Sequence, residues 1–570
     1  MQVLCNAIWR RWGWLALFPV LVGCPSPADD DATADDDATA DDDATEDDDS
    51  TGDDDDSVDC DLTVPDDVAT LHAALGAAPE AGLICVMPGT YHESLLLDGL
   101  PVRLRGLDGP AATVIDAGGA GPALVVDSDL DGFVVEGFTL TGGLAERGGG
   151  IRIDDGSPLL RDLIIDGNQA SERGGGIHVS GGAPLLESVI VRGNQADGDG
   201  GGLSVAGGVI DFSGGQVVGN SAGDDGGGLY LSSGGTWLRS TEISGNEAAE
   251  KGGGLYVISS DLQADRVLLA DNTAGTRGGG ALIDDADIEL RSTVFRDNVA
   301  GDDGGGLLVA GCAPALDGVV LYANSAGGDG GGLFAENAQP ALTHVAALDN
   351  HAVGDGGGLS VHQGELVARQ LIAAGNLSED DGGGLDVNGS TLSLSFASIV
   401  SNGCFDAGGG LYLWEVDATL DHVDLSNNLA ATHGGGLVCD GCAPAIRWGN
   451  VWANLPTNVE SETGDPTGAD GNIAVHPAYI LDSGTDLLAW DLHLVRTSEL
   501  VDAGDPTTPD PDGSPADIGA YGGSDAAGWD RDGDGYPEWW QPGPYEPAIY
   551  PGAGWDCDDL DGSVDPGNGC

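Results

Sequence analysis

Short apolar stretches separated by glycine, asparagine and aspartate run through the middle of this 570-residue chain. The clearest stretch follows each Gly-Gly-Gly triplet, where two apolar residues flank one residue of the opposite orientation, as at Ile151/Ile153 and Leu203/Val205. This alternation is that of a β-strand, because successive side chains of a strand point to opposite faces. Two further brief apolar segments follow in each unit, and the Gly, Asn and Asp between them leave no room for a helix. The pattern therefore predicts an all-β chain.

The unit has a fixed length. Triplets of glycine begin at residues 148, 174, 200, 226, 252, 278, 304, 330, 356, 382, 408 and 434, each 26 residues after the last. A fixed period between about 20 and 50 residues is the signature of a solenoid, in which each repeat packs on its neighbours. We therefore predict about 12 regular coils over residues 144–450, with irregular capping coils at the ends.

A second column accompanies the glycines. An asparagine precedes every triplet from the second onward by six residues: Asn168, Asn194, Asn220, Asn246, Asn272, Asn298, Asn324, Asn350, Asn376, Asn402 and Asn428. Identical residues in successive parallel strands stack about 4.8 Å apart. Stacked amides can donate and accept along the column and so satisfy buried backbone groups, while glycine permits positive φ at a tight corner. We assign both columns a structural role.

The repeat has a recognisable form. Gly-Gly-Gly-[Ile/Leu] with [Phe/Ile/Leu/Val]-x-x-Asn resembles the repeats of polymorphic outer-membrane proteins, and residues 62–525 resemble the right-handed parallel β-helix of the pectin-lyase-like superfamily. Within that resemblance, residues 61–143 correspond to the N-terminal cap and first coils, with a short capping helix over residues 66–78. Residues 451–525 correspond to the closing segment. The resemblance implies a right-handed parallel β-helix solenoid.

The first 60 residues have a different character. Residues 1–24 have the basic start and short apolar run of a secretion signal, and Leu21-Val22-Gly23-Cys24 resembles a lipobox. The resemblance implies that Cys24 becomes the lipidated N-terminus at the cell envelope, outer membrane or cell surface; plain secretion is the alternative. Residues 25–60 are rich in Asp and carry no basic residue, so we expect a disordered, self-repelling stalk.

The last segment, residues 526–570, is acidic. One Asp-x-Asp-x-Asp-Gly loop lets alternate carboxylates converge on a hard cation, but Gln541 stands where an EF-hand would have glutamate. A second cluster resembles thrombospondin type 3 repeats or the metal-binding tails of bacterial surface proteins. We expect structural calcium there, with a solvated acidic tail as the alternative. The proposed calcium ligands are Asp530, Asp532, Asp534, Asp556, Asp558, Asp559 and Asp561.

Charge narrows the range of partners. The formal net charge is −76, with only 19 Lys plus Arg. This excludes electrostatically driven binding of nucleic acid and disfavours adhesion to anionic lipid, so membrane contact is expected only through the N-terminal lipid. Divalent cations are the favoured counter-ions.

The cysteines suit an oxidising compartment, because loss of Cys5 and lipidation of Cys24 leave an even number. The disulfide candidates are Cys60 with Cys85 and Cys557 with Cys570. Cys439 and Cys442 form a single Cys-x-x-Cys, which is weak evidence for zinc or redox chemistry. Cys404 occupies a small-residue column, and we expect a buried thiol there.

The residue just before each triplet changes from coil to coil. This pre-triplet row reads Arg147, Arg173, Asp199, Asp225, Lys251, Arg277, Asp303, Asp329, Asp355, Asp381, Ala407 and His433. Aspartates in four consecutive coils repel one another unless cations or solvent intervene. One hypothesis is a ledge at Asp303, Asp329, Asp355 and Asp381 that binds calcium, or a sugar through calcium, with Lys251 and Arg277 able to meet acidic sugars. An exposed row of screened charges is the alternative.

Two hypotheses for function remain. The first is a non-catalytic, lipid-anchored scaffold for adhesion or glycan binding, whose partner is a polysaccharide or another cell surface. The second, implied by the resemblance, is a polysaccharide lyase, hydrolase or epimerase with a long lateral groove. Catalytic groups usually converge from inserted loops, and no insertion interrupts residues 148–436. We therefore favour binding over catalysis and assign no catalytic residue.

Overall fold

The computed structural model describes residues 60–128, 131–481, 487 and 490–524. The chain divides between Asp59 and Cys60 into two units, and the description below concerns the second. Cys24, the seven aspartates of the tail, and Cys557 with Cys570 lie outside the described residues. Among those that are described, no helix is long and apolar enough to cross a membrane.

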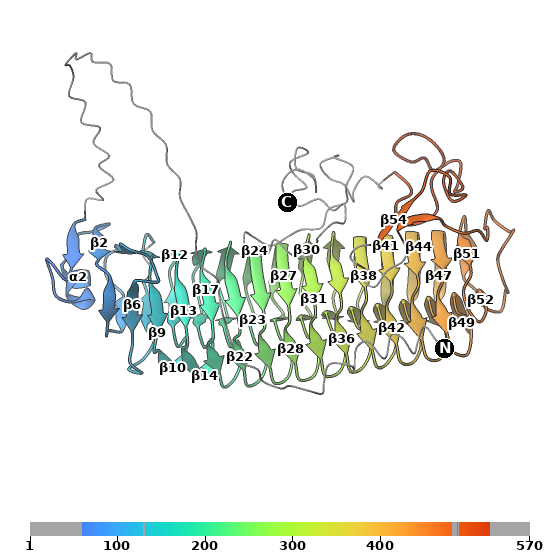
Figure 1. Ribbon diagram of the computed structural model, residues 1–570. Coiled ribbons are helices and arrows are strands. Elements are labelled where there is room, and N and C mark those ends of the chain that lie inside the picture. The colour runs from blue at the N-terminus through green and yellow to red at the C-terminus, as the bar shows by residue number, and fades with distance from the viewer. Residues whose placement is uncertain (1–59, 129–130, 482–486, 488–489, 525–570) are drawn as a thin grey trace, which may run out of the picture. The chain divides into compact units, whose positions relative to one another are not determined.

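Successive coils place their strands side by side in three parallel sheets (Figure 1). In each regular coil a strand of sheet B follows the triplet, one or two strands of sheet A come next, and a strand of sheet C follows the asparagine. The pairing keeps the sequence period, because Ile177 pairs with Leu203 and Leu203 with Leu229. Sheet B contains 15 strands, so the solenoid makes about 15 turns. The predicted fold class is confirmed. The fold is a parallel β-helix.

Sheet B supplies the face beside the glycine triplets. Its strands are β4 (Leu95–Leu97), β7 (Leu124–Asp127), β11 (Ile151–Asp155), β15 (Ile177–Val179), β19 (Leu203–Val205), β23 (Leu229–Ser232), β26 (Leu255–Ile258), β29 (Ala281–Asp284), β33 (Leu307–Ala310), β37 (Leu333–Glu336), β40 (Leu359–His362), β43 (Leu385–Asn388), β46 (Leu411–Trp414), β49 (Leu437–Asp440) and β52 (Val459–Glu460).

Sheet C is the narrowest of the three, and most of its strands have two residues. Its strands are β10 (Leu144–Arg147), β14 (Gln169–Arg173), β18 (Gln195–Ala196), β22 (Ser221–Ala222), β25 (Glu247–Ala248), β28 (Thr273–Ala274), β32 (Val299–Ala300), β36 (Ser325–Ala326), β39 (His351–Ala352), β42 (Leu377–Ser378), β45 (Gly403–Cys404) and β48 (Leu429–Ala430).

Sheet A is the widest sheet. Its strands are β1 (Leu62–Val64), β2 (Leu83–Val86), β3 (Gly89–Tyr91), β5 (Arg103–Gly106), β6 (Thr113–Asp116), β8 (Val134–Glu136), β9 (Thr139–Thr141), β12 (Leu159–Arg161), β13 (Ile164–Asp166), β16 (Leu185–Glu187), β17 (Ile190–Arg192), β20 (Val209–Ser213), β21 (Gln216–Val218), β24 (Gly235–Ser244), β27 (Asp261–Ala270), β30 (Ile288–Arg291), β31 (Val294–Arg296), β34 (Ala315–Asp317), β35 (Val320–Tyr322), β38 (Ala341–Leu348), β41 (Glu365–Ala374), β44 (Thr391–Val400), β47 (Asp417–Ser426), β50 (Ala445–Arg447) and β51 (Asn450–Trp452).

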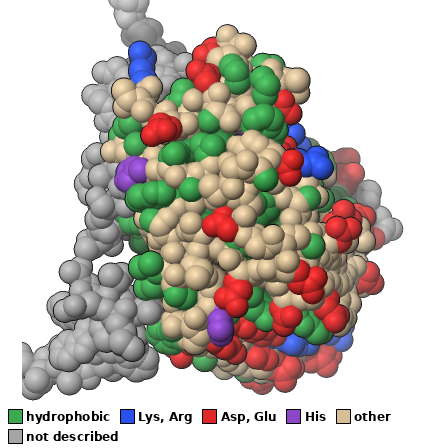
Figure 2. Space-filling model, turned by 90° about the vertical axis from the view of Figure 1, so that its right-hand side faces the viewer, with side chains coloured by type: hydrophobic (Ala, Val, Ile, Leu, Met, Phe, Trp, Pro, Cys, Tyr) green, Lys and Arg blue, Asp and Glu red, His purple; other side chains and the backbone are tan. Residues whose placement is uncertain are grey.

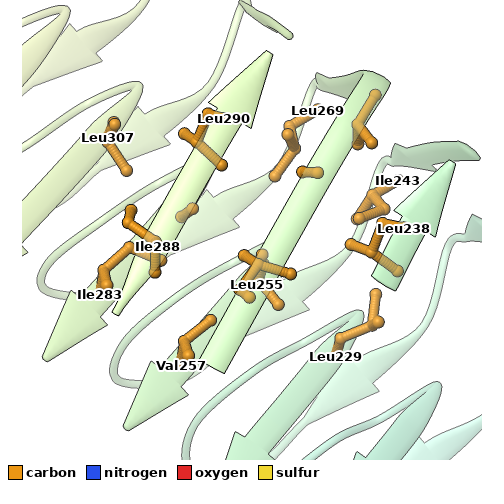
Figure 3. Close-up of a cluster of buried hydrophobic side chains, with 14 of the residues drawn as sticks. Leu229, Leu238, Ile243, Leu255, Val257, Leu269, Ile283, Ile288, Leu290 and Leu307 are labelled. Carbon is orange, nitrogen blue, oxygen red and sulfur yellow. The ribbon is translucent and has the colours of Figure 1, made fainter. Parts of the chain in front are cut away.

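The core is a set of apolar rows inside the coils. Figure 3 shows inward side chains such as Leu229, Leu255 and Val257 of sheet B beside Leu238 and Leu269 of sheet A. All five are at most 3% exposed. Full burial of one such side chain contributes about 1.5–3 kcal/mol. Because each row repeats in every coil, the core continues along the whole solenoid.

The glycine and asparagine columns meet at one corner. The Asn272 side-chain amide donates to Asn298 Oδ1 at 3.0 Å and to the Ile243 carbonyl at 2.8 Å. A Cβ added to Gly254 would lie 2.6 Å from the Gly280 carbonyl oxygen and 2.9 Å from the Asn272 carboxamide. The third glycine of each triplet therefore leaves space for the asparagine ladder, which reaches from Asn168 to Asn428 and continues to Asn454.

The N-terminal cap is close to the expected one. Helix α2 spans Leu71–Ala77, a shorter stretch than the 66–78 expected, because Thr70 has an extended backbone and its side chain accepts the Ala73 N–H. Strands β1 and β2 open sheet A, and a disulfide joins Cys60 to Cys85 in β2. This bond ties the start of the described unit to its first coil.

The closing segment folds back onto the outer face of sheet A. Strands β53 (Tyr479–Leu481) and β54 (Asp491–Leu494) pair antiparallel. Residues 519–522 lie against the outer face of sheet A, where Ser398 Oγ accepts the Ala520 N–H at 3.0 Å. An outward apolar patch that includes Leu348 and Ile372 packs there against Leu492 and the neighbouring side chains. The sequence period did not predict this patch, because it occupies outward positions of only some coils.

Candidate functional site

The outer face of sheet B carries the charges that the sequence singled out. In each regular coil the middle residue of the sheet B strand faces outward beside the pre-triplet residue. This middle row reads Arg152, His178, Ser204, Tyr230, Tyr256, Leu282, Leu308, Phe334, Ser360, Asp386, Tyr412 and Val438. The row is basic at its start, aromatic and aliphatic from Tyr230 to Phe334, and polar at Ser360 and Asp386.

Two basic pre-triplet side chains cover two tyrosines of the middle row. Arg173 lies over the Tyr230 ring with its Cζ 5.2 Å from the ring centroid, and Lys251 lies over the Tyr256 ring with its Nζ 5.8 Å away. Tyr230, Tyr256 and the aliphatic residues that follow form a buried cluster with Phe334. The Tyr230 and Tyr256 rings are therefore covered by these two cations.

Arg277 joins two rows of this face. Its guanidinium lies 3.0 Å from Asp303 and 3.4 Å from Glu336, the last residue of β37. Lys251 and Arg277, the two cations predicted to meet acidic sugars, thus already contact other side chains of this chain. An acidic ligand would have to compete with Asp303 and Glu336 for Arg277.

The four predicted aspartates form one line. Oδ1 of Asp303 accepts the backbone N–H of Asp329 at 3.1 Å, and Oδ1 of Asp329 accepts that of Asp355 at 2.8 Å. The line continues from Asp355 to Asp381 at 2.9 Å and from Asp381 to Ala407 at 2.8 Å. Each carboxylate therefore satisfies a turn N–H of the following coil. The sequence identified the repulsion between these groups but not this backbone compensation.

Burial raises the pKa values of several aspartates in this line. It raises the pKa of Asp355 to about 7, with the nearby Asp386 charge as the next cause, and the pKa of Asp381 to about 6. The pKa of Asp303 is also raised, mainly by burial. One carboxylate oxygen each from Asp355, Asp380 and Asp381 lie within 4.8 Å of one another. Such an arrangement of oxygens suits a hard divalent cation, and Asp380 is a member that the column pattern missed.

A second cluster beside this line was also missed. His362, at the end of β40, has its Nε2 3.1 Å from Asp386 Oδ2 and 3.2 Å from Ser360 Oγ. Asp386 is 1% exposed and burial raises its pKa, whereas the hydrogen bond with Asp386 raises the pKa of His362. The sequence indicates this cluster only by a change of residue type at the outward position of the sheet B strand.

The Ser360, His362 and Asp386 cluster does not have the geometry of a nucleophilic triad. In a triad the serine and the carboxylate bind opposite nitrogens of the imidazole, so that one nitrogen accepts the proton while the other is held. Both partners here contact Nε2. Ser360 is moreover fully buried, so its hydroxyl cannot reach a substrate carbonyl.

The opposite end of the face is basic. His178 is 2% exposed, and burial together with Arg147 and Arg173 lowers its pKa to about 4. The three arginines of this end have acidic partners, such as Asp199, which lies 3.0 Å from Arg173. The outer face of sheet B therefore changes from paired basic groups to crowded acidic ones along the solenoid.

The acidic character is visible from the C-terminal end of the coils. Figure 2 shows Asp and Glu side chains gathered toward one edge, with few basic side chains among them.

Of the remaining cysteines, Cys439 and Cys442 form a disulfide and Cys404 is buried. Burial raises the pKa of the Cys404 thiol to about 12, which suits a packing role.

No family model and no curated protein matches the sequence. The fold is similar to that of pectate lyase Pel9A, with a TM-score of 0.23 and 13% identity over 79% of this chain and 89% of that one. It is also similar to PL6 family alginate lyase AlyGC, with a TM-score of 0.14 and 11% identity over 71% and 98% of the two chains. These likenesses concern the β-helix fold alone.

Proposed function

We propose that this protein is a non-catalytic surface scaffold whose sheet B face binds an extended glycan with the help of calcium. The observation that carries the proposal is the unbroken pre-triplet row, in which the charge changes from coil to coil over twelve successive coils. A rigid face that repeats about every 4.8 Å is suited to a polymer that also repeats along its length.

Calcium supplies the missing positive charge. Carboxylates from Asp355, Asp380 and Asp381 approach closely enough to share a cation, and calcium takes six to eight oxygen ligands. Sugar hydroxyl or carboxylate oxygens can complete such a shell. The net charge of −76 makes direct binding of a polyanion unfavourable without that cation.

Binding is favoured over catalysis for two reasons. No inserted loop brings reactive groups over the regular coils. In addition, the Ser360, His362 and Asp386 cluster holds both partners on one nitrogen. The proposed setting is the cell surface, with a lipid at Cys24 and the acidic stalk between the lipid and the β-helix.

The test is a glycan array with the mature protein, in calcium and in chelator, followed by turnover assays on pectate and alginate. We expect calcium-dependent binding without release of unsaturated or reducing ends. Asp355→Ala and Asp381→Ala should weaken binding at least about tenfold, since each removes a charged oxygen ligand. Asp197→Ala, an exposed aspartate outside the row, is the matched control.

One observation favours the enzyme as a second candidate. Lys251 is the single lysine of the chain, and it lies in the charged row with its backbone N–H on Asp225 Oδ1 at 3.1 Å. A lyase needs a base for the sugar C5 proton and a group that neutralises the sugar carboxylate. Product release that is lost in Lys251→Ala or Asp329→Asn would establish the lyase and overturn the scaffold.

A further inference from the structure

A separate cavity lies at the corner where the chain turns from sheet B into sheet A. Its volume is about 560 Å³, and it spans four successive coils. Asp285 and Asp287 line it in one coil, Gly311 and Cys312 in the next, and Asn337 and Gln339 in the one after. Nothing proposed for the outer face of sheet B involves these residues.

The sequence explains why the cavity opens at this corner. The coil in its middle contributes the small residues Gly311 and Ala313, where the preceding coil has Asp285 and Asp287. Strand β34 begins only at Ala315, after Pro314, which has no N–H to extend the ladder. A Cβ added to Gly311 would meet no atom within 4 Å. One coil is therefore recessed between two coils with longer polar side chains.

The walls of the cavity present exposed carboxylate and carboxamide groups. Asp285 and Asp287 form one wall, and Asn337 and Gln339 form the other, two coils or about 10 Å away. Within the described part of the chain, their side chains make no hydrogen bond or ion pair. Polar groups that converge on a preformed space are the part of a small-molecule site that fixes the orientation of the ligand.

The lining excludes several ligand classes. The described lining residues include no lysine, arginine or aromatic side chain, so an anion or a flat apolar ring finds no partner. The described carboxylates that converge within 4.8 Å are those of Asp355, Asp380 and Asp381, not those of this cavity. Burial raises the pKa of the Cys312 thiol to about 11, so the floor is a neutral, unreactive thiol.

We propose that this corner cavity binds one or two units of a neutral, polyhydroxylated ligand, that is, a neutral sugar. Vicinal hydroxyls would donate to the carboxylates of Asp285 and Asp287 and accept from the carboxamides of Asn337 and Gln339. The recessed coil at Gly311 gives the ring its space. The inference stands on the cavity alone and does not depend on the function proposed for sheet B.

The experiment uses the mature protein and a panel of neutral trisaccharides built from glucose, galactose and mannose, titrated by calorimetry in calcium-free buffer. We expect at least one to bind saturably. Ala313→Trp, which fills the cavity from an exposed position, and Asp287→Ala should each raise the Kd at least about tenfold. Asp417→Ala alters the position of a later coil that corresponds to Asp287 and lies outside the cavity, so it should leave the Kd unchanged.

Absence of binding by every trisaccharide at millimolar concentration overturns the proposal, as does binding that Ala313→Trp leaves intact. Binding of calcium alone at this corner, removed by Asp287→Ala, would also overturn it. Circular dichroism of each variant shows that the fold is retained. Asp355→Ala should not change trisaccharide binding, so a failure here is distinct from a failure of the function proposed for sheet B.

Discussion

Asn272 donates its side-chain amide to Oδ1 of Asn298 at 3.0 Å, while the Asn272 backbone N–H donates to the same oxygen at 3.1 Å. Both residues are fully buried. One side-chain oxygen thus accepts two hydrogen bonds from the preceding coil. The asparagine ladder therefore joins the coils in addition to the hydrogen bonds of the sheets.

Asn272→Ala should lower the free energy of unfolding by about 1–3 kcal/mol, because it leaves buried backbone groups without partners. Urea denaturation followed by circular dichroism measures the change in midpoint. Gln263→Ala, at an exposed position of the preceding strand β27, should shift the midpoint little. Equal stability of Asn272→Ala and the parent chain would show that the ladder is dispensable.

Gly254→Ala should be more damaging than the asparagine variant. The new Cβ would lie 2.6 Å from the Gly280 carbonyl oxygen, so the backbone of two coils would have to separate. We expect a loss of several kcal/mol or failure to fold, seen in expression yield and thermal melting. A Cβ at Gly76 in helix α2 meets no atom within 4 Å, so Gly76→Ala should stabilise the chain by up to about 1 kcal/mol. A mild effect of Gly254→Ala would disprove the close approach.

Stability should decrease as pH rises toward neutrality. Burial raises the pKa of Asp355 to about 7 and of Asp381 to about 6, above the roughly 3.9 of an unfolded aspartate. The folded state therefore holds these protons more tightly, so their contribution is complete below about pH 4 and is lost as pH rises through about 6 to 7. The thermal midpoint in calcium-free, low-salt buffer should fall between pH 5 and pH 8.

Asp355→Asn tests the origin of this dependence. Asparagine keeps an acceptor for the Asp381 N–H but has no proton to lose. The midpoint of the variant should change less between pH 5 and pH 8 than that of the parent. Calcium added at pH 8 should raise the parent's midpoint, because the cation replaces the lost protons at the ledge. An unchanged pH profile in Asp355→Asn would place the titrating group elsewhere.

Tyr479→Phe should loosen the closing segment without unfolding the coils. The Tyr479 hydroxyl hydrogen-bonds the buried Asp424 carboxylate, which Asn450 and Ser426 also contact. Loss of one partner leaves the other two, so we expect a cost of about 1–3 kcal/mol that is confined to this segment. Hydrogen exchange should quicken in β53 and β54 and stay slow in β44. Uniform quickening over both regions would mean that the segment and the coils unfold together.

The solenoid follows from the sequence because its constraints are local and repeated. The period of 26 residues sets the register, as the pairing of Leu229 with Leu255 shows, and the asparagine and glycine columns together set one corner. Nothing distant along the chain is needed for either. The structural role given to Asn272 depends only on the coil before it and the coil after it.

Tertiary structure decided what the outward residues do. The sequence placed Lys251 and Arg277 in a charged row, but only the folded chain shows that one covers Tyr256 and the other pairs with Asp303 and Glu336. His362 of one coil contacts Asp386 of the next, and the 26-residue period does not predict that contact. Inward positions repeat because every coil must bury the same core, whereas outward contacts depend on the length and charge of each neighbour and have no period to reveal them.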